Sequence, residues 1–198
     1  WPRARTGRAD TPQARLALGL IVATVPTVIA GLILHVTGLS QAMRSITVIG
    51  WTMLGFGLLL YWVDQKAPET KEAENWGIRD ALIMGLWQVL ALIPGTSRSG
   101  ITITGARQLG YTREDGARIA MLMSIPTILA SGTLLALDAV RGADMQLARD
   151  GAIAALFAFL SALLALSLMM RLLRSVSFTP YVIYRVILGL ILLIMAYS

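Results

Sequence analysis

The sequence has little charge and few of the side chains that usually hold metals or cross-link a chain. It contains no cysteine and one histidine, and only 14% of its 198 residues are charged. The absence of cysteine excludes a disulfide framework and a thiolate metal site. A soluble domain carries about 25% charged residues, so a water-facing globule of this length would lack the polar groups to cover its surface. The low charge therefore argues against an ordinary cytosolic enzyme, a disordered region and a coiled coil.

Apolar residues take the place of the missing charged residues. Hydrophobic side chains account for 56% of the chain, and its mean hydropathy is +0.69. The formal charge of +6 comes mostly from Lys and Arg in the links between apolar runs, which is typical of cytoplasmic loops in membrane proteins. We therefore predict an all-α, polytopic integral membrane protein that binds no nucleic acid.

Five continuous apolar runs are long enough to cross ~30 Å of hydrocarbon as helices. Because they are continuous rather than alternating, they argue against a β-barrel. A polar loop with five acidic residues covers residues 64–80. We predict a single membrane domain over residues 1–198, with transmembrane helices at 16–36, 45–63, 119–139, 152–170 and 181–197.

The segment 81–109 contains two apolar pieces, ALIMGLWQVLALI and ITITGARQL, separated by PGTSRSG. The first piece would reach only ~20 Å as a helix, and Pro94 and Gly95 end it. Two structures fit this pattern: one kinked transmembrane helix, or a re-entrant hairpin that enters and leaves on the same side.

The distribution of Lys and Arg favours the hairpin. With a re-entrant hairpin, one side of the membrane collects 12 basic residues and the other 3, whereas a full crossing gives 9 against 6. The stronger bias fits the positive-inside rule better. It predicts five transmembrane helices plus one hairpin, with the N-terminal end cytoplasmic and Ser198 outside. The 12 residues are Arg3, Arg5, Arg8, Arg15, Lys66, Lys71, Arg79, Arg107, Arg113, Arg118, Arg171 and Arg174.

The hairpin tip has the composition of an anion site. Arg98 lies between Ser97 and Ser99 in a loop of small residues that leads into a second short helix. A helix N-terminus presents backbone N–H groups and a positive dipole, and a guanidinium suits phosphate geometry. We predict that Arg98, Ser97 and Ser99 form the reactive centre. The predicted substrate-binding residues around them are Gly95, Thr96, Gly100, Thr102 and Gln88.

Two polar residues near this motif have open roles. Gln88 either contacts phosphate or bonds to a neighbouring helix. Arg185, near the start of the last apolar run, either joins the site or is structural.

The stretch from Trp87-Gln88 through PGTSRSGITITG resembles the second signature of the undecaprenyl pyrophosphate phosphatases of the bacitracin-resistance family. The resemblance continues through ARIAMLMSIPTILASG (117–132) and SFTPYVIYR (177–185), and in spacing it covers essentially the whole chain. It implies an inverted-repeat fold in a bacterial inner membrane, with a pocket open to the outer face. The implied reaction is hydrolysis of undecaprenyl pyrophosphate to undecaprenyl phosphate and inorganic phosphate, which recycles the lipid carrier of peptidoglycan synthesis.

The resemblance also implies roles for individual residues. Arg98 matches the essential phosphate-binding arginine of the family, and Ser97, Ser99 and Thr102 match its hydroxyl partners. The implied cofactor is Mg²⁺ or Ca²⁺, and the partners are the lipid substrate and the membrane, with a homodimer left open.

One part of the family pattern is absent. The chain has no counterpart of the first signature, in which two glutamates a turn apart precede a proline-serine-serine stretch ending in Gly-His. We therefore expect the metal ligands, the histidine and the nucleophile upstream of Trp1, and no metal ligands in this chain. The alternatives are a polyprenyl-phosphate translocator or small-anion transporter that uses the same pocket, and a non-catalytic fragment.

Overall fold

A computed structural model describes residues 12–141, 145–173 and 176–198. Four arginines of the charge count, Arg3, Arg5, Arg8 and Arg174, lie outside these ranges. The described regular structure is helical apart from one isolated bridge between Lys71 and Tyr111. The α-helices are α1 (Pro12–Val36), α2 (Leu39–Ala42), α3 (Ile46–Lys66), α4 (Ile78–Val89), α5 (Arg98–Gln108), α6 (Arg113–Arg141), α7 (Met145–Leu173) and α8 (Thr179–Tyr197), with 3-10 turns η1 (Ala73–Asn75) and η2 (Leu90–Leu92).

Within the described ranges, four helical stretches are long and apolar enough to cross a membrane, namely Ala14–Val36, Ile46–Lys66, Arg149–Arg171 and Thr179–Tyr197. Their large apolar side chains face outward; Ile194, for example, is 68% exposed. Lipid solvates such surfaces, whereas water does not. The chain is therefore an all-helical, multi-pass membrane protein. The predicted span at 119–139 lies within α6, which is not one of these four stretches, so the number of crossings stays a prediction.

The segment containing PGTSRSG forms a helical hairpin. At 1.5 Å per residue, the 12 residues of α4 and the 11 residues of α5 rise only about 18 Å and about 17 Å. Between them, Ile93 is extended, because the residue before a proline avoids the helical region. At the open end, the Tyr111 hydroxyl donates to Asp80 Oδ2 at 2.7 Å. The two ends of the hairpin therefore lie together.

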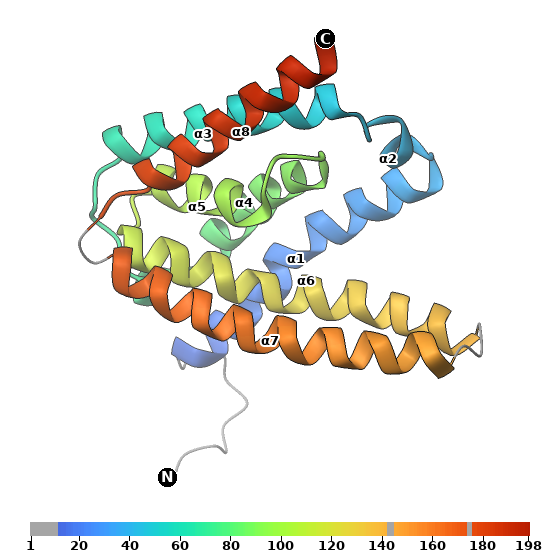
Figure 1. The fold of residues 1–198 in the computed structure, drawn as a ribbon. Coiled ribbons are helices and arrows are strands. Elements are labelled where there is room, and N and C mark those ends of the chain that lie inside the picture. Colours follow the sequence, from blue (N-terminus) through green and yellow to red (C-terminus); the bar gives the residue numbers. More distant parts are fainter. Residues whose placement is uncertain (1–11, 142–144, 174–175) are drawn as a thin grey trace, which may run out of the picture.

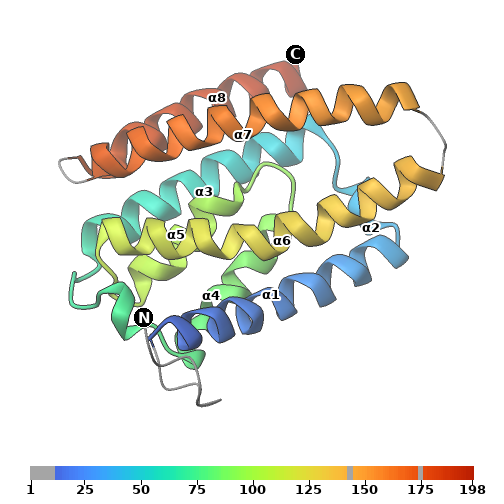
Figure 2. The same cartoon turned by 90° about the horizontal axis from the view of Figure 1, so that it is seen from below.

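The hairpin lies between two groups of helices (Figure 1). α3 and α8 pack along each other on one side, while α1 packs on α4 and α6 packs on α5 on the other. α7 packs beside α6 at the lower edge of Figure 1, and the view from below shows their axes running nearly parallel (Figure 2). α5 contacts α3, α4 and α6, which places the hairpin tip in the interior.

Two buried clusters hold the hairpin in place. One lies between α1, α4, α5 and α6, and the other joins α5 and α6 to α3 and α8. Small residues let the backbones approach closely, as is typical of membrane helices. A Cβ at Gly85 would lie 2.5 Å from the Ala23 carbonyl oxygen, so only glycine permits α4 to lie this close to α1. The clusters contain Ala23, Trp76, Ala81, Met84, Ala106, Tyr111, Ile119 and Met123, and Leu60, Ile103, Ala117, Ala120, Phe178 and Val182.

Candidate functional site

The loop at the hairpin tip requires glycine at position 95. Gly95 has φ +86°, a left-handed conformation that L side chains rarely adopt. A Cβ there would lie 2.3 Å from Thr52 Oγ1 and 2.7 Å from the Ile49 carbonyl oxygen. The loop therefore packs directly against the backbone of α3, and its position depends on the absence of a side chain.

Two side chains fix the loop carbonyls. Arg185 of α8 is only 4% exposed, and its Nη2 donates to the Gly95 carbonyl oxygen at 2.7 Å. Thr52 Oγ1 lies 2.6 Å from the Pro94 carbonyl oxygen. Of the two roles left open for Arg185, this contact supports the structural one, because the guanidinium is used to hold backbone. Sequence reasoning did not single out Thr52, since it is 42 residues from Pro94.

Ser97 lies where the loop meets α5 and has φ +65°. Such backbone strain in a non-glycine residue persists where the surroundings impose it, often at functional sites. Ser97 Oγ accepts the Gly100 N–H at 3.3 Å, and lies 2.7 Å from the Tyr181 hydroxyl and 3.4 Å from Ser99 Oγ. The two predicted serines therefore lie side by side. Tyr181 was missed, although it lies one helical turn before Arg185.

Arg98 begins α5 and is half-buried. Its Nη1 lies 3.5 Å from the Ser124 carbonyl oxygen of α6, a long contact for a hydrogen bond. Among the residues that the structure describes, no carboxylate lies within 4.0 Å of the guanidinium. Arg98 therefore keeps a positive charge in the interior without a fixed counter-ion.

The structure places the hydroxyl of Thr102 differently from the two serines. Thr102 is fully buried, and its Oγ1 lies 2.8 Å from the Arg98 carbonyl oxygen and 3.1 Å from that of Ser99. This back-bonding within a helix uses the hydroxyl proton. Thr102 therefore supports the first turn of α5, and only its oxygen lone pairs remain for a ligand.

Gln88 bridges two proline-containing helices. Its Nε2 donates to Thr27 of α1 at 3.2 Å and to Thr127 of α6 at 3.1 Å. Of the two roles left open for Gln88, these contacts support the bond to neighbouring helices. Its Oε1 and the Oγ1 of buried Thr96 have no hydrogen-bond partner within the described ranges. Gln88 and Thr96, both predicted to bind substrate, therefore each have a side-chain oxygen that can still form a hydrogen bond.

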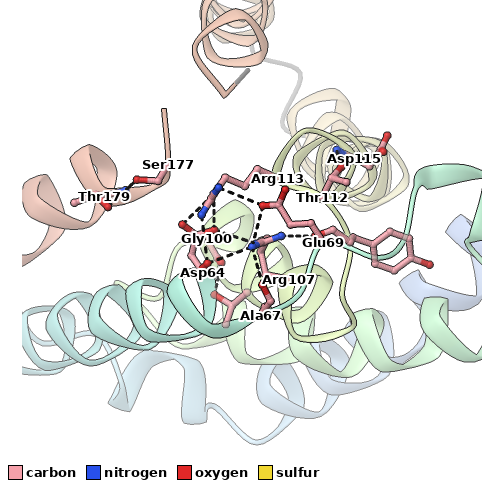
Figure 3. Close-up of polar contacts among 12 residues, drawn as sticks. Asp64, Ala67, Glu69, Gly100, Arg107, Thr112, Arg113, Asp115, Ser177 and Thr179 are labelled. Atoms are coloured by element: carbon pink, nitrogen blue, oxygen red, sulfur yellow. Dashed lines mark hydrogen bonds and ion pairs between the residues drawn. The ribbon is translucent and has the colours of Figure 1, made fainter. Parts of the chain in front are cut away.

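The open end of the hairpin carries a charge network (Figure 3). Asp64 Oδ1 lies 3.0 Å from Arg107 Nε and 2.9 Å from Arg113 Nε, and Glu69 lies 3.2 Å from both guanidinium groups. The side chains of Arg107 and Asp64 are each 1% exposed, so each charge is compensated by the other. This network ties the end of α5 to α3 and α6.

A second polar cluster lies beside this network. Asp80 accepts the Tyr111 hydroxyl at 2.7 Å and pairs with Lys71 Nζ at 2.9 Å. Burial, together with the adjacent Asp80 carboxylate, raises the pKa of Tyr111. The tyrosine therefore stays protonated and donates to Asp80, which closes the hairpin at its open end.

The tip offers hydroxyls, backbone N–H groups and a cation, but no base. Among the residues described, the nearest polar partner of Ser97 is Tyr181, and no group of three or more His, Cys, Asp or Glu could hold a metal ion. The ligands of the expected Mg²⁺ or Ca²⁺ stay a prediction. The arrangement can bind an anion and orient it.

Composition and fold define a multi-pass helical membrane protein whose interior holds an arginine-containing hairpin. Residues 1–191 match the family of the bacitracin resistance protein BacA, so the chain belongs to this family. This confirms the resemblance found from PGTSRSG and its neighbours.

Curated relatives agree with this assignment. The undecaprenyl-diphosphatase of Ruegeria pomeroyi is 75% identical over 197 residues, which are 100% of this chain and 74% of the relative. Those of Roseobacter denitrificans and Chromohalobacter salexigens are 66% and 40% identical, over 99% and 98% of this chain and 73% of each relative. The relatives are therefore longer than this chain by about a quarter of their own length.

Proposed function

We propose that this chain carries the diphosphate-binding half of an undecaprenyl-diphosphatase active site, in an enzyme that hydrolyses undecaprenyl diphosphate to undecaprenyl phosphate and inorganic phosphate. The same activity is named in relatives that align with the whole chain. The part of those relatives that this chain does not cover supplies the nucleophile and any metal ligands. The substrate is a lipid, so the site has to be reached from the membrane.

The proposal rests on one observation: three arginines in the interior differ in their hydrogen-bond and ion-pair partners. Arg107 is neutralised by Asp64 and Glu69, and Arg185 is fixed by the Gly95 carbonyl. Within the part of the chain that the structure describes, Arg98 has only the long contact to Ser124. An arginine inside a membrane protein is costly to insert, and such residues usually mark functional sites. An unpaired guanidinium beside two hydroxyls is suited to a bound phosphate.

In this proposal the loop binds the diphosphate as one unit. Arg98 donates to phosphate oxygens and neutralises charge that develops on the leaving group. Ser97 and Ser99 add hydroxyl donors, and the backbone from Gly95 to Gly100 shapes the cradle. Tyr181 orients Ser97, while Arg185 and Thr52 hold the loop. The chain's own residues therefore bind and position the diphosphate; the ion suggested by the family resemblance, Mg²⁺ or Ca²⁺, takes its ligands from outside the described residues.

The proposed membrane arrangement is five crossings with a re-entrant hairpin, within an inverted-repeat fold of the bacterial inner membrane. Both ends of the hairpin lie together, and each arm is shorter than a bilayer. We place that end on the cytoplasmic side because most loop arginines and lysines lie there, so the site opens to the outer face.

Because the chain contains no cysteine, single-cysteine variants can test this topology without background. Gln65→Cys at the end of α3 and Gln108→Cys at the end of α5 should react with an impermeant maleimide from the same face. Gln41→Cys in α2 should react from the other face. All three positions are exposed and uncharged. Labelling of Gln65→Cys and Gln108→Cys from opposite faces would refute the re-entrant hairpin.

The activity test uses this chain joined to the part of the Ruegeria pomeroyi relative that it does not cover. Phosphate release from undecaprenyl diphosphate should fall about ten- to a hundredfold in Arg98→Ala, which corresponds to the ~1.5–3 kcal/mol of a charge-assisted contact. Arg171→Ala, at an exposed position on α7, is the matched control and should leave the rate unchanged. Equal rates for Arg98→Ala and the parent would remove Arg98 from the mechanism.

The same preparation distinguishes hydrolysis from transport. An enzyme releases phosphate in detergent, where no compartments exist, whereas a translocator of polyprenyl phosphate or small anions shows activity only across a sealed bilayer. Absence of phosphate release from the joined protein in detergent, with lipid binding retained, would contradict the proposed hydrolysis.

A further inference from the structure

A cavity lies away from the hairpin tip, between the start of α1, η1 and the start of α6. It has a volume of about 180 Å³ and is lined by Arg15, Leu16, Ala73, Glu74, Trp76, Arg118, Ile119 and Leu122. It shares no residue with the tip loop. On α6, Arg118 precedes Ser124 by six residues, which corresponds to about 9 Å along the axis and roughly 120° around it. The cavity therefore opens on a different face from the Arg98 contact.

Two cations line this cavity from different helices. Arg15 of α1 and Arg118 of α6 are both exposed, and neither has a carboxylate within 4.0 Å among the residues placed in the structure. Among the described residues, Glu74 is the one carboxylate in the lining. The described lining thus carries a net charge of +1 at neutral pH, which favours an anionic ligand.

Trp76 contributes packing to the cavity wall. The residue is 4% exposed, and the edge of its six-membered ring packs on Gly19 of α1. Its indole nitrogen is buried, so the hydrogen bonds to a ligand in the cavity come from the two arginines.

The cavity also lies at the border of an apolar surface. The membrane-compatible stretch of α1 begins at Ala14, directly before Arg15, and Leu16, Ile119 and Leu122 give the cavity an apolar side. Arginine and tryptophan next to apolar side chains are typical of the level at which lipid headgroups lie. A ligand with an anionic head and an apolar body fits both parts.

We propose that this cavity binds the headgroup of a monoanionic phospholipid, with the phosphate between Arg15 and Arg118. The phosphate oxygens accept from both guanidinium groups. The headgroup hydroxyls of phosphatidylglycerol donate to Glu74, and the acyl chains follow Leu16 and Leu122. Basic cavities between membrane helices bind anionic headgroups in the same way. This site is separate from the proposed active site and does not depend on the proposed reaction.

The test measures phosphatidylglycerol bound to the purified chain in detergent, by native mass spectrometry across a lipid titration. Arg15→Gln and Arg118→Gln should each weaken binding about fivefold, as expected for one basic residue at a membrane surface. Arg79→Gln, at an exposed position in the first turn of α4, is the matched control and should leave binding unchanged.

Several results would overturn the proposal. Equal binding by the parent and the Arg15→Gln/Arg118→Gln double variant would remove the cavity as the site. An equal loss in Arg79→Gln would show that general surface charge attracts the lipid. Displacement of the lipid by millimolar inorganic phosphate would assign the cavity to a free anion. Loss of binding when the chain is joined to the uncovered part of the relative would show that protein fills the cavity.

Discussion

Replacing Gly95 by alanine tests whether the position of the tip loop determines activity. The left-handed conformation of Gly95 costs an alanine about 1–2 kcal/mol. In addition, the new Cβ would lie 2.3 Å from Thr52 Oγ1 and 2.7 Å from the Ile49 carbonyl oxygen. The hydroxyl of Thr52 can rotate away, but the backbone of α3 cannot, so the loop has to shift away from α3.

Such a shift moves Arg98 and Ser97 together relative to the rest of the site. A displacement of about 1 Å at a reacting centre costs about a hundredfold in rate. We therefore expect kcat/KM for phosphate release to fall about a hundredfold in Gly95→Ala, measured on the joined protein used for Arg98→Ala. Thermal unfolding of the same samples separates this loss from a loss of folded protein.

Gly110 provides the matched control. It also has a left-handed φ, +90°, but the nearest atom to its Cβ would be Thr70 Oγ1 at 3.0 Å, and it lies at the opposite end of the hairpin. Gly110→Ala should lower the unfolding temperature and leave kcat/KM unchanged. A parental kcat/KM in Gly95→Ala, or an equal fall in Gly110→Ala, would refute the argument that loop position sets the rate.

Three further substitutions test the supports of the hairpin and its tip. Asp64→Asn leaves buried Arg107 without its closest counter-charge. We therefore expect the free energy of unfolding, measured by denaturant titration, to fall by about 3–5 kcal/mol. A smaller loss than in a surface Asp→Asn control would contradict this. Tyr181→Phe removes the hydroxyl next to Ser97 and should cost about 0.5–1.5 kcal/mol of transition-state binding, seen in kcat/KM without a change in unfolding temperature. Arg185→Met removes the donor to the loop carbonyl and should raise KM for the lipid more than it lowers kcat, and an unchanged KM would show that the loop holds its position without it.

The sequence predicts the helical class well because hydropathy is a local property. Apolar runs at 16–36 and 181–197 lie within α1 and α8, and PGTSRSG separates two short helices, as Pro94 and Gly95 indicate. The family assignment also follows from local motifs. These features need no knowledge of which helices are neighbours.

The support of the site could not be predicted in the same way, because it depends on contacts between distant residues. Thr52 is 42 residues from Pro94, and Arg185 is 90 residues from Gly95. The pairing of Arg107 with Asp64 joins residues 43 positions apart, and no local pattern in the sequence indicates it. Thr102 stays a predicted substrate-binding residue, and the sequence did not indicate that its hydroxyl also bonds back to the Arg98 carbonyl of its own helix.

The two ends of the hairpin follow opposite electrostatic rules, and this contrast explains how an uncompensated charge can be kept in the interior. At the open end, Asp64 and Glu69 neutralise Arg107 and Arg113, so the network stabilises the position of α5 without attracting an anion. At the tip, Arg98 has no such partner among the described residues, so its charge is available to a ligand. If a carboxylate paired with Arg98 as Asp64 pairs with Arg107, a diphosphate would first have to displace it, at a cost of several kcal/mol for separating a buried ion pair. The charge pairs that stabilise the hairpin are therefore kept apart from the arginine that we propose binds the diphosphate.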